Sequence, residues 1–572
     1  MLWVVVLEVV LVGWVAFRIA QVYVDLRGAR SAAAAIESAV SDERVDDARG
    51  QITRLQKHAA RARSGTSGPV WRVLEHVPFT GDDARTLAAV SHVVDELATQ
   101  AIPPAVDAWK VIDREGLVDE RGAVDLATVK KAAPQLANAH RSFESADKGM
   151  GQLDTAGNIG SIAASYDELT DAIRSVNGLL GSADTALSVL PAMAGEDGPR
   201  RYLLVLQNNA ELRSSGGFPG VAVELDAIHG RVTLGKPLSS SAVFKKLGRP
   251  ILPITSEERA LFGDFLGEYF VDANFTPDFP RTAQLMAARW EREEGNRLDG
   301  VLMMDTVSLA YLLRATGPVT VDGVRLDADN AVTELLGNTY VRLAGQPAEQ
   351  DAFFQNVTQA VFTRVTGGGV NPSELVTAVA RAASEGRIRV RSFHDAEARR
   401  IGDARIAGIV PRDEGSAQLG VYLNDATIAK MNIFLDYAVN VQSTSCRGNR
   451  QRLAMDMTLR SGAPKDMSGF DTWVTGGGFY APIGFQGLVV YLYPPVGGNV
   501  STIQVDGEAA KVTTRPYLGR EVAAISIRLG PGETQHLTWS TTTGPGQTGD
   551  VDIDVTPSAV RGTKSAIAPS AC

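Results

Sequence analysis

The first residues of the chain contain an almost uninterrupted apolar run, Leu2 to Val24 (LWVVVLEVVLVGWVAFRIAQVYV). As a helix, this run is long enough to cross a hydrocarbon core of about 30 Å. Glu8 and Arg18 interrupt it, but charged side chains near the ends of a span can reach the membrane surface. The sequence therefore predicts a transmembrane anchor over residues 1–24, and the alternative is a buried helix of a soluble domain. A cleaved signal peptide fits less well, because the run is long and lacks a basic segment before it.

The orientation of this anchor is left open by the residues that flank it. Arg18, Arg27 and Arg30 lie at or beyond its far end, so a positive-inside count would place the body of the chain in the cytoplasm. The two cysteines favour the opposite side. A disulfide between Cys446 and Cys572 would tether the C-terminal tail to the last domain and would need an oxidising compartment. The alternative is two unrelated thiols.

Length and charge limit the classes of protein that the chain can belong to. At 572 residues, and with roughly 150 residues per domain, about three or four folded units are expected. Hydrophobic residues make up 44% and charged residues 21%, which is typical of folded protein. The net charge of -10 offers no basic field to a phosphate backbone, so nucleic acid is not an expected partner.

Residues 25–195 are predicted to form a helical bundle or stalk. Apolar residues recur there with spacings of three and four, which is the period of one helix face. The stripes are Ala48, Ile52, Leu55, Ala59 and Ala62; Leu87, Val90, Val94, Leu97 and Ala101; and Leu169, Ile173, Val176 and Leu180. They fit either the core of antiparallel helices or a surface through which a stalk forms an oligomer.

The rest of the sequence changes texture twice, which predicts a multidomain α+β protein. In residues 200–430, strand-like runs alternate with helical stretches, the pattern of a mixed α/β domain. In residues 432–558, apolar and polar side chains alternate between Gly, Pro and Asn turns, which predicts an antiparallel β-sandwich. The tail, residues 559–572, has no periodicity and is expected to be loose apart from Cys572.

A polar turn follows the apolar run that ends at Gln207, and ligands of α/β sheets bind at such strand ends. The amides, the guanidinium and the backbone N–H groups of this turn would suit a phosphate or a sugar, and its carboxylate is an acceptor. These candidate residues are Asn208, Asn209, Glu211, Arg213, Gly216 and Gly217. The alternative is a turn whose side chains only satisfy the local backbone.

Two further clusters lie downstream. Asp272 and Asp278 offer hard oxygen ligands for Mg²⁺, although Asp278 is also placed to cap the helix that follows it. A later helix carries Asn338, Tyr340 and Arg342, and Arg342 either binds phosphate in a cleft or is solvated. The sequence has no HExxH, GxSxG or P-loop motif, which disfavours metalloprotease, α/β-hydrolase and nucleotide chemistry.

These clusters carry a family resemblance. The stretches YLLVLQNNAELRSSGGFPG, VDANFTPDFP and DGVLMMDTVSLAYLLRATGPVTV resemble signature stretches of the family known as domain of unknown function 4012 (DUF4012), common in actinobacterial envelopes. Members usually carry an N-terminal membrane helix with the body outside. The resemblance therefore implies a single-pass cell-membrane protein, most of which is extracytoplasmic.

The core of that family is in turn distantly similar to the LytR-CpsA-Psr ligases, which move glycopolymers from polyprenyl pyrophosphate onto peptidoglycan. The similarity implies that Arg342 occupies the position of a pyrophosphate-binding arginine, with Asp351 and Gln355 in the following helix. The ligases' Arg-x-Asp turn is not reproduced at residues 235–240, and the second arginine expected beside Arg342 is Ala344.

Three functions are compatible with the sequence. The first is an envelope protein that binds or assembles cell-wall glycans or lipid-linked glycopolymers without chemistry. The second is a metal-assisted phosphoglycosyl transferase in which Arg213 and Arg342 neutralise a pyrophosphate. Asp272 or Asp278 would then hold Mg²⁺ at the leaving group, and Glu211 would deprotonate the acceptor hydroxyl. The third is a purely structural scaffold of the envelope.

Overall fold

The computed structural model describes residues 18, 21–33, 35, 45–77, 80–119, 121–151, 153, 155, 157–367, 370–402, 404–412, 415 and 417–572. The chain divides into two compact units, Met1–Gly116 with Ala127–Leu187, and Leu117–Leu126 with Ser188–Cys572. The predicted anchor over residues 1–24 lies mostly outside the described residues. Among the helices that are described, none is both long and apolar enough to cross a membrane.

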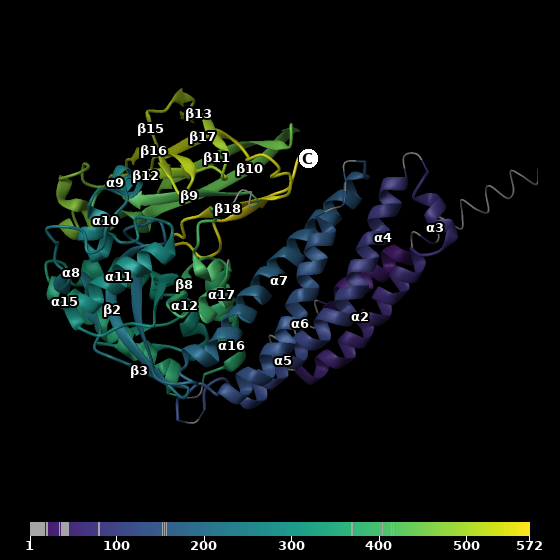
Figure 1. Ribbon diagram of the computed structural model, residues 1–572, viewed down its shortest axis with the longest axis horizontal. Helices are drawn as coiled ribbons and strands as arrows, with labels where there is room; N and C mark the ends of the chain where they lie inside the picture. The colour runs from purple at the N-terminus through teal and green to yellow at the C-terminus, as the bar shows by residue number, and fades with distance from the viewer. Residues whose placement is uncertain are drawn as a thin grey trace, which may run out of the picture. The chain divides into compact units, whose positions relative to one another are not determined.

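The first unit is helical (Figure 1). Its elements are a helix over residues 21–33, α2 (Val45–Gly65), α3 (Pro69–Leu74), α4 (Gly81–Glu96), the π-helix η1 (Leu97–Ala101), α5 (Ile102–Glu115), α6 (Leu126–Met150) and α7 (Gly160–Met193). Most of the predicted stripes pack inside the unit: Leu55 and Ala59 against Ala98, and Leu97 against Phe143. Val176 remains 37% exposed. The stripes therefore supply the core of the unit itself.

One segment inside the predicted bundle belongs elsewhere. Leu117–Leu126 is grouped with the second unit, where Val118 bridges Val124 and Ala123 bridges Arg231. The predicted helical bundle or stalk over residues 25–195 therefore contains a segment that belongs to the second unit.

The second unit begins with the central sheet, whose strand order is β3-β2-β1-β5-β8, with β4 also paired to β2. The strands are β1 (Arg200–Asn208), β2 (Phe218–Ile228), β3 (Arg231–Leu234), β4 (Leu238–Ser239), β5 (Gly300–Asp305) and β8 (Ile388–Ser392). β1 runs parallel to β5 and antiparallel to β2, and β5 runs antiparallel to β8. This confirms the mixed sheet predicted from the alternation of strands and helices.

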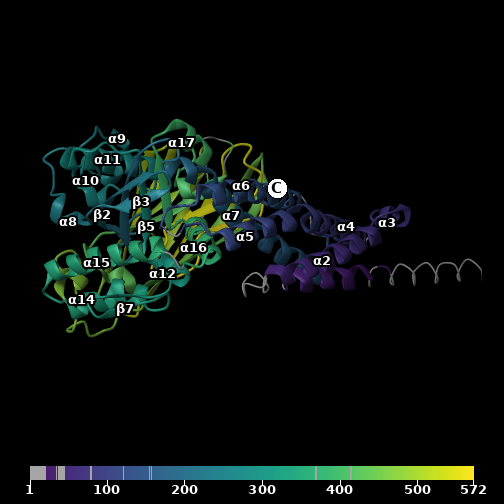
Figure 2. The ribbon, with the colours of Figure 1, turned by 90° about the horizontal axis from the view of Figure 1, so that it is seen from below.

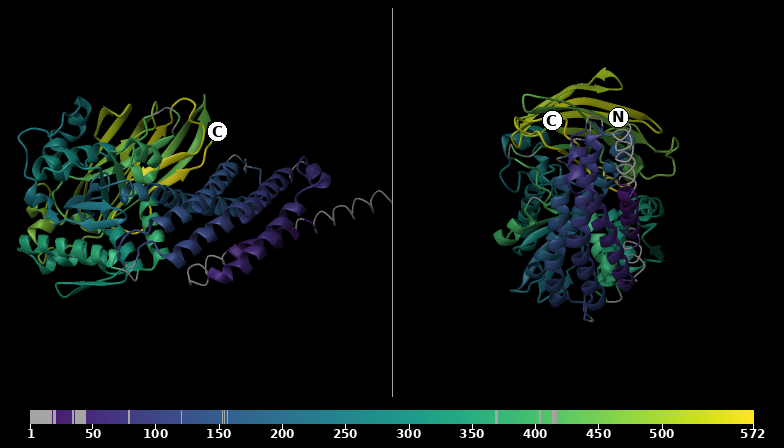
Figure 3. Two further views of the ribbon diagram at one scale, coloured as in Figure 1. Left: turned by 60° about the horizontal axis from the view of Figure 1, so that its bottom comes forward. Right: turned by 90° about the vertical axis from the view of Figure 1, so that its right-hand side faces the viewer.

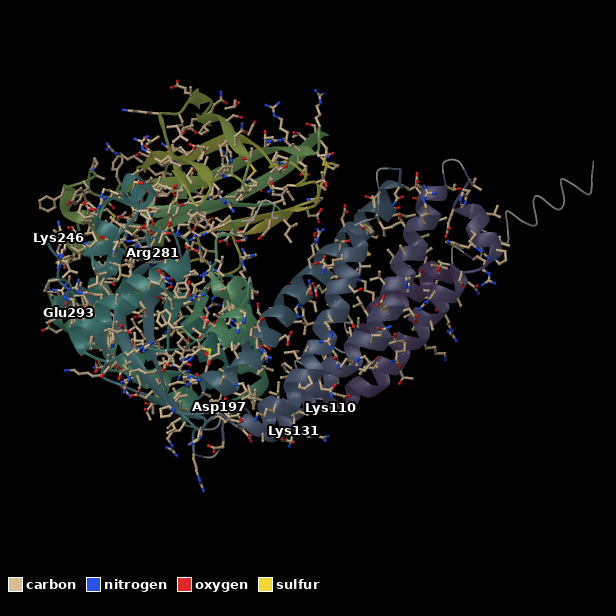
Figure 4. The ribbon with its side chains drawn as sticks, in the orientation of Figure 1. Lys110, Lys131, Asp197, Lys246, Arg281 and Glu293 are labelled. Atoms are coloured by element: carbon tan, nitrogen blue, oxygen red, sulfur yellow. A yellow bond between two sulfur atoms is a disulfide. The ribbon has the colours of Figure 1, made fainter. Side chains whose placement is uncertain are left out.

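Helices cover both faces of this sheet, with α9, α10 and α11 on one side and α12, α15 and α16 on the other (Figure 2). Their bounds are α8 (Ser240–Val243), α9 (Ser256–Phe262), α10 (Phe265–Glu268), η2 (Phe270–Asp272), α11 (Phe279–Glu294), α12 (Thr306–Thr316), α13 (Ala331–Thr333), η3 (Glu334–Asn338), α14 (Thr339–Arg342), α15 (Pro347–Thr366), α16 (Pro372–Ser384), α17 (Asp395–Ile401) and η4 (Arg405–Ala407), with the hairpin β6 (Val319–Val321) and β7 (Val324–Leu326). Alternate residues Leu203 and Val205 of β1 pack with α11. Arg281 of α11 pairs with Glu258 of α9 at 2.6 Å, which fastens these helices together (Figure 4).

Two further sheets face each other around one apolar core at the C-terminal end of the chain. The first holds β10 (Leu435–Arg447), β11 (Arg450–Ser461), β17 (Thr534–Thr542), β13 (Asn499–Val505) and β14 (Glu508–Ala509); the second holds β15 (Val512–Tyr517), β16 (Arg520–Leu529), β12 (Gln486–Tyr493), β9 (Gln418–Asp425), β18 (Val551–Val555) and β19 (Ala566–Ala568). The short helices η5 (Met431–Phe434), α18 (Thr472–Thr475) and η6 (Gly476–Gly478) lie between strands. The sheets are antiparallel except for the parallel pair β18 and β9. The predicted β-sandwich, residues 432–558, is therefore too short at both ends, because β9 before it and β19 after it belong to this pair of sheets.

The C-terminal tail is ordered, contrary to the expectation for residues 559–572. β19 pairs with β18, and Cys572 forms the favoured disulfide with Cys446 (Figure 4). The buried guanidinium of Arg387 donates to the backbone carbonyl oxygens of Val560 and Gly562 at 2.6 and 3.0 Å. The tail has no periodic pattern of apolar side chains, because it is held by strand pairing, by its backbone carbonyl oxygens and by one disulfide.

Candidate functional site

The polar turn, residues 209–217, connects β1 to β2 at one edge of the central sheet. Because β1 and β5 are parallel, with Gln207 beside Asp305, both strands end at this edge. A ligand site is predicted here from the sequence, because ligands of α/β sheets bind at such strand ends. Most side chains of the turn are buried instead, Glu211 at 2% and Arg213 at 4% exposure.

The carboxylate of Glu211 is held by two cations. Arg213 Nη2 donates to Oε1 at 2.9 Å, and Lys430 Nζ donates to Oε2 at 3.1 Å. Burial opposes ionisation, but the charges of Lys430 and Arg213 outweigh it, so the pKa of Glu211 lies below its ordinary value. A carboxylate with a lowered pKa and both oxygens occupied is a poor general base.

Arg213 is enclosed as completely as Glu211. Its Nη2 also donates to Asp272 at 3.2 Å, and its Nη1 donates to the carbonyl of Leu212 at 3.0 Å. The guanidinium carbon lies 4.6 Å from the ring centroid of Phe275, within cation–π range. Burial lowers the pKa of Arg213, but Glu211 and Asp272 raise it further, and the net shift is upward. The guanidinium is permanently charged and already paired.

Tyr340 joins this network from α14. Asn208 Nδ2 donates to the Tyr340 hydroxyl at 2.5 Å, and Lys430 Nζ lies 5.4 Å from the ring centroid. Burial raises the pKa of Tyr340. Tyr340 is the one member of the predicted helical cluster that the structure brings to the turn.

The sequence patterns did not mark four residues of the network, which lie from the end of β9 to η5: Asn424, Asp425, Lys430 and Asn432. Asn424 accepts from the Ser214 backbone at 2.7 Å, and Asn432 accepts from the Leu212 backbone at 2.9 Å. The polar run at the end of β9, Asn424-Asp-Ala-Thr, was the available signal. These residues join the C-terminal sheets to the central sheet.

Asp425 is a buried carboxyl of this network whose pKa is raised. Its Oδ1 accepts from the backbone and hydroxyl of Thr427 at 2.7 and 2.9 Å, while its Oδ2 is buried without a hydrogen-bond partner. Burial, aided by the negative charge of Glu211, raises the pKa of Asp425 to about 6. The ionised form of this carboxyl is therefore disfavoured in the folded chain.

Asn338 and Arg342 lie apart from the turn. Asn338 donates to Glu334 Oε1 at 2.6 Å, and Arg342 donates to Glu334 Oε2 at 3.4 Å. Arg342 is 37% exposed in its side chain and lies over the Phe353 ring. The pairing of Arg342 with Arg213 around one pyrophosphate is therefore not supported by the geometry.

The two glycines of the turn, Gly216 and Gly217, are explained by the geometry of its backbone. The Gly216 N–H donates to the carbonyl of Arg213 at 2.8 Å, and the Gly217 N–H donates to Gln207 Oε1 at 2.7 Å. A Cβ at Gly217 would lie 2.4 Å from the carbonyl oxygen of Asn208. These N–H groups close the turn and are not presented to an anion. Asn209 is likewise engaged, donating to Asp305 at 3.1 Å.

The two predicted magnesium ligands face arginines. Asp272 pairs with Arg213, and Asp278 accepts from Arg412 Nη2 at 3.1 Å. Burial raises the pKa of both carboxyls, against the opposing effect of these arginines. Asp278 stands at the start of α11, but its side chain does not cap the helix. Across the described part of the chain, no three His, Cys, Asp or Glu side chains are grouped to hold a metal ion.

The comparison with known families locates this network. Residues 197–340 match the family described as "Protein of unknown function (DUF4012)". The DUF4012 match thus includes β1, the polar turn, β5 and Tyr340, but it ends before Lys430 and Asp425. No curated protein and no solved structure matches the chain. The similarity to the ligases stays a prediction.

A second candidate surface lies outside the DUF4012 match, in the segment between β11 and β12. We call it the aromatic segment: the exposed side chains of Trp473, Phe479, Tyr480 and Ile483, of which Phe479 is 87% exposed. Behind them, Val474 and Met467 are buried in a cluster with Tyr340. Asp471 caps α18 through the Trp473 N–H and accepts from the Gly345 N–H at 2.5 Å. The aromatic rings are therefore presented by an anchored loop. The sequence analysis did not single them out.

Proposed function

We propose that the chain is a membrane-anchored, extracytoplasmic protein of the cell envelope that binds cell-wall glycan through the aromatic segment. Anchorage rests on the length of the apolar run from Leu2 to Val24. The extracytoplasmic position is supported by the bond between Cys446 and Cys572, because disulfides persist in oxidising compartments. The DUF4012 match adds no activity, since that family has no described function.

Binding is favoured over catalysis by the geometry of the polar turn. A transferase acting there would need a free carboxylate base and an accessible guanidinium. The Glu211 carboxylate is instead paired with Arg213 and Lys430, and the Arg213 guanidinium is paired with Glu211 and Asp272. Arg342 is exposed but pairs with Glu334. The turn is better explained as a joint between sheets than as a reaction centre.

The observation that carries the proposal is the exposure of Trp473, Phe479 and Tyr480 on one anchored loop. Exposed apolar patches on folded proteins mark interaction sites. Aromatic faces suit the apolar faces of sugar rings, and Ser468 and Asp466, which are exposed in the same segment between β11 and β12, offer a hydroxyl and a carboxylate to sugar hydroxyls. A cell-wall polysaccharide offers both surfaces.

The test is sedimentation of the full chain with purified cell-wall polysaccharide. Phe479→Ala and Tyr480→Ala are each expected to weaken binding by about two- to tenfold, the range expected for one aromatic contact. Phe265→Ala is the matched control, because Phe265 is 51% exposed on α10 in the central domain. Equal binding by all three variants and the unmodified chain would refute the proposed surface.

Location is tested separately with two reporter fusions after residue 572, one active only in the cytoplasm and one active only outside it. Activity of the outside reporter alone is expected. Activity of the cytoplasmic reporter alone would contradict the proposed location, whatever the binding assay shows.

A further inference from the structure

A short helix at one end of the first unit presents an unpartnered apolar face. α3 packs onto α4 through Trp71, which is buried and donates from Nε1 to the Ala84 carbonyl at 3.0 Å. Val70 and Val73, and Val77 in the following turn, are exposed, and Val73 reaches 66%. Arg72 and His76 line a shallow hollow beside Val73. We call these exposed residues of α3 and the turn the α3 surface.

The chain just before the α3 surface contacts the helix over residues 21–33. A Cβ at Gly65 would lie 2.8 Å from Val22 Cγ2, and α3 begins four residues later, at Pro69. Figures 1 and 3 show α3 at the same end of the helical unit as the start of that helix. Beside the buried Val22, Tyr23 and Val24 are exposed at 54% and 62%. Two separate chain segments thus expose apolar side chains at one end of the unit.

The chemistry of this end matches a bilayer interface. The apolar run from Leu2 continues into the helix that carries Tyr23 and Val24, so the chain leads directly from one to the other. Tyrosine and long basic side chains are typical of the head-group region, where the apolar body and the polar tip are both satisfied. Arg27 already lies 5.2 Å from the ring centroid of Tyr23, and Arg72 adds a second cation. Cations at this depth are attracted to anionic lipid.

We infer that the α3 surface rests in the head-group region of an anionic membrane, beside the point where the chain enters it. The inference rests on the proposed anchor and adds a second, peripheral contact to it. A helix with one buried and one apolar exposed face can lie in the plane of such an interface. The contact would fix the orientation of the first unit relative to the bilayer through a second point besides the anchor.

The test uses the full chain reconstituted into phosphatidylcholine–phosphatidylglycerol vesicles. Val73→Cys is labelled with an environment-sensitive fluorophore, since both native cysteines are bonded to each other. Val176→Cys is the matched control. The start of α7 lies beside α4 near α3, since the Ile159 N–H donates to Asp83 at 2.9 Å, and Val176 is an exposed valine about 24 Å along α7 from Gly160. We expect a blue shift and loss of emission with lipid-borne quenchers at Val73 only. Replacing the anionic lipid should reduce both effects.

Flotation of the vesicles separates the two claims. A chain that floats, with the Val73 label as unshifted and unquenched as the Val176 label, would overturn the membrane contact and leave the anchor intact. The occupant of the α3 surface would then be a protein. A chain that does not float would overturn the anchor, and the contact that rests on it.

Discussion

The buried carboxyl of Asp425 predicts a pH-dependent stability that one substitution should remove. Its pKa is about 6 in the folded chain against an ordinary 3.8, a difference that corresponds to about 3 kcal/mol. Because the folded-state pKa is raised, the folded chain holds the proton more tightly than the unfolded chain. The protonated carboxyl therefore stabilises fully below about pH 4, and this contribution is lost as the pH rises through about 6.

Asp425→Asn keeps an oxygen for the N–H and hydroxyl of Thr427 but cannot ionise. Relative to the unmodified chain, the variant should gain up to about 3 kcal/mol in its free energy of unfolding between about pH 4 and pH 8. Urea unfolding followed by tryptophan fluorescence measures this difference, since Trp539 is buried in the same pair of sheets. Asp436→Asn is the control, because Asp436 is 64% exposed and outside the network.

The result that would refute this reasoning is a difference between Asp425→Asn and the unmodified chain that stays constant, within about 0.5 kcal/mol, across that pH range. Such a result would mean that Asp425 is solvated in the folded chain. It would also remove the argument that Asp425 belongs to a closed network.

Three further experiments probe the network and its surroundings. Arg213→Ala leaves two buried carboxylates without their guanidinium and should lower the free energy of unfolding by about 3–5 kcal/mol. Arg342→Ala should lower the free energy of unfolding by less than about 1 kcal/mol, because Arg342 is partly exposed. Equal losses for Arg213→Ala and Arg342→Ala in urea unfolding would contradict the assignment of Arg213, and not Arg342, to the buried network. Cys572→Ser removes a link across 126 residues, for which chain entropy gives up to about 5 kcal/mol; a melting temperature insensitive to this variant would speak against the bond. Gly217→Ala forces a Cβ to within 2.4 Å of a backbone carbonyl and should lower the free energy of unfolding by about 1–3 kcal/mol, whereas Gly220→Ala, with its nearest contact at 3.9 Å, should leave the urea midpoint unchanged.

Local pattern was sufficient to predict the frame of the site. The apolar run before Gln207 and the Gly-containing turn after it predicted a strand and its polar end, and the structure has β1 and the turn there. The spacing of Glu334, Asn338 and Arg342 also held information that we did not use. Residues four apart share a helix face, so these three side chains were placed to pair with each other. They do so, and Tyr340 faces the other way into the network.

The remainder of the site depends on contacts that no local pattern encodes. Lys430 donates to Glu211 from 219 residues away in the sequence, and that ion pair occupies a carboxylate oxygen that would otherwise be free to act as a base. The residue types in the turn were compatible with both outcomes. β9 and η5 bury the turn, and the polar groups that could have bound an anion are instead bonded to residues of these two elements.

The closed network has a consequence for how the function can be dissected. Removing the C-terminal sheets would take away Lys430 and leave Glu211 buried with one cation fewer. It would also remove the carbonyl oxygens of Ser558 and Val560 from the buried Arg387, which pairs with Asp305 at the end of β5. Breaking buried pairs of this kind destabilises by several kcal/mol, which is comparable with the whole stability of a domain. A loss of function in a chain without the C-terminal sheets would therefore reflect unfolding of the central sheet. Point variants on the exposed aromatic segment and on the α3 surface leave these pairs in place, so a loss of binding in them can be attributed to the surface itself.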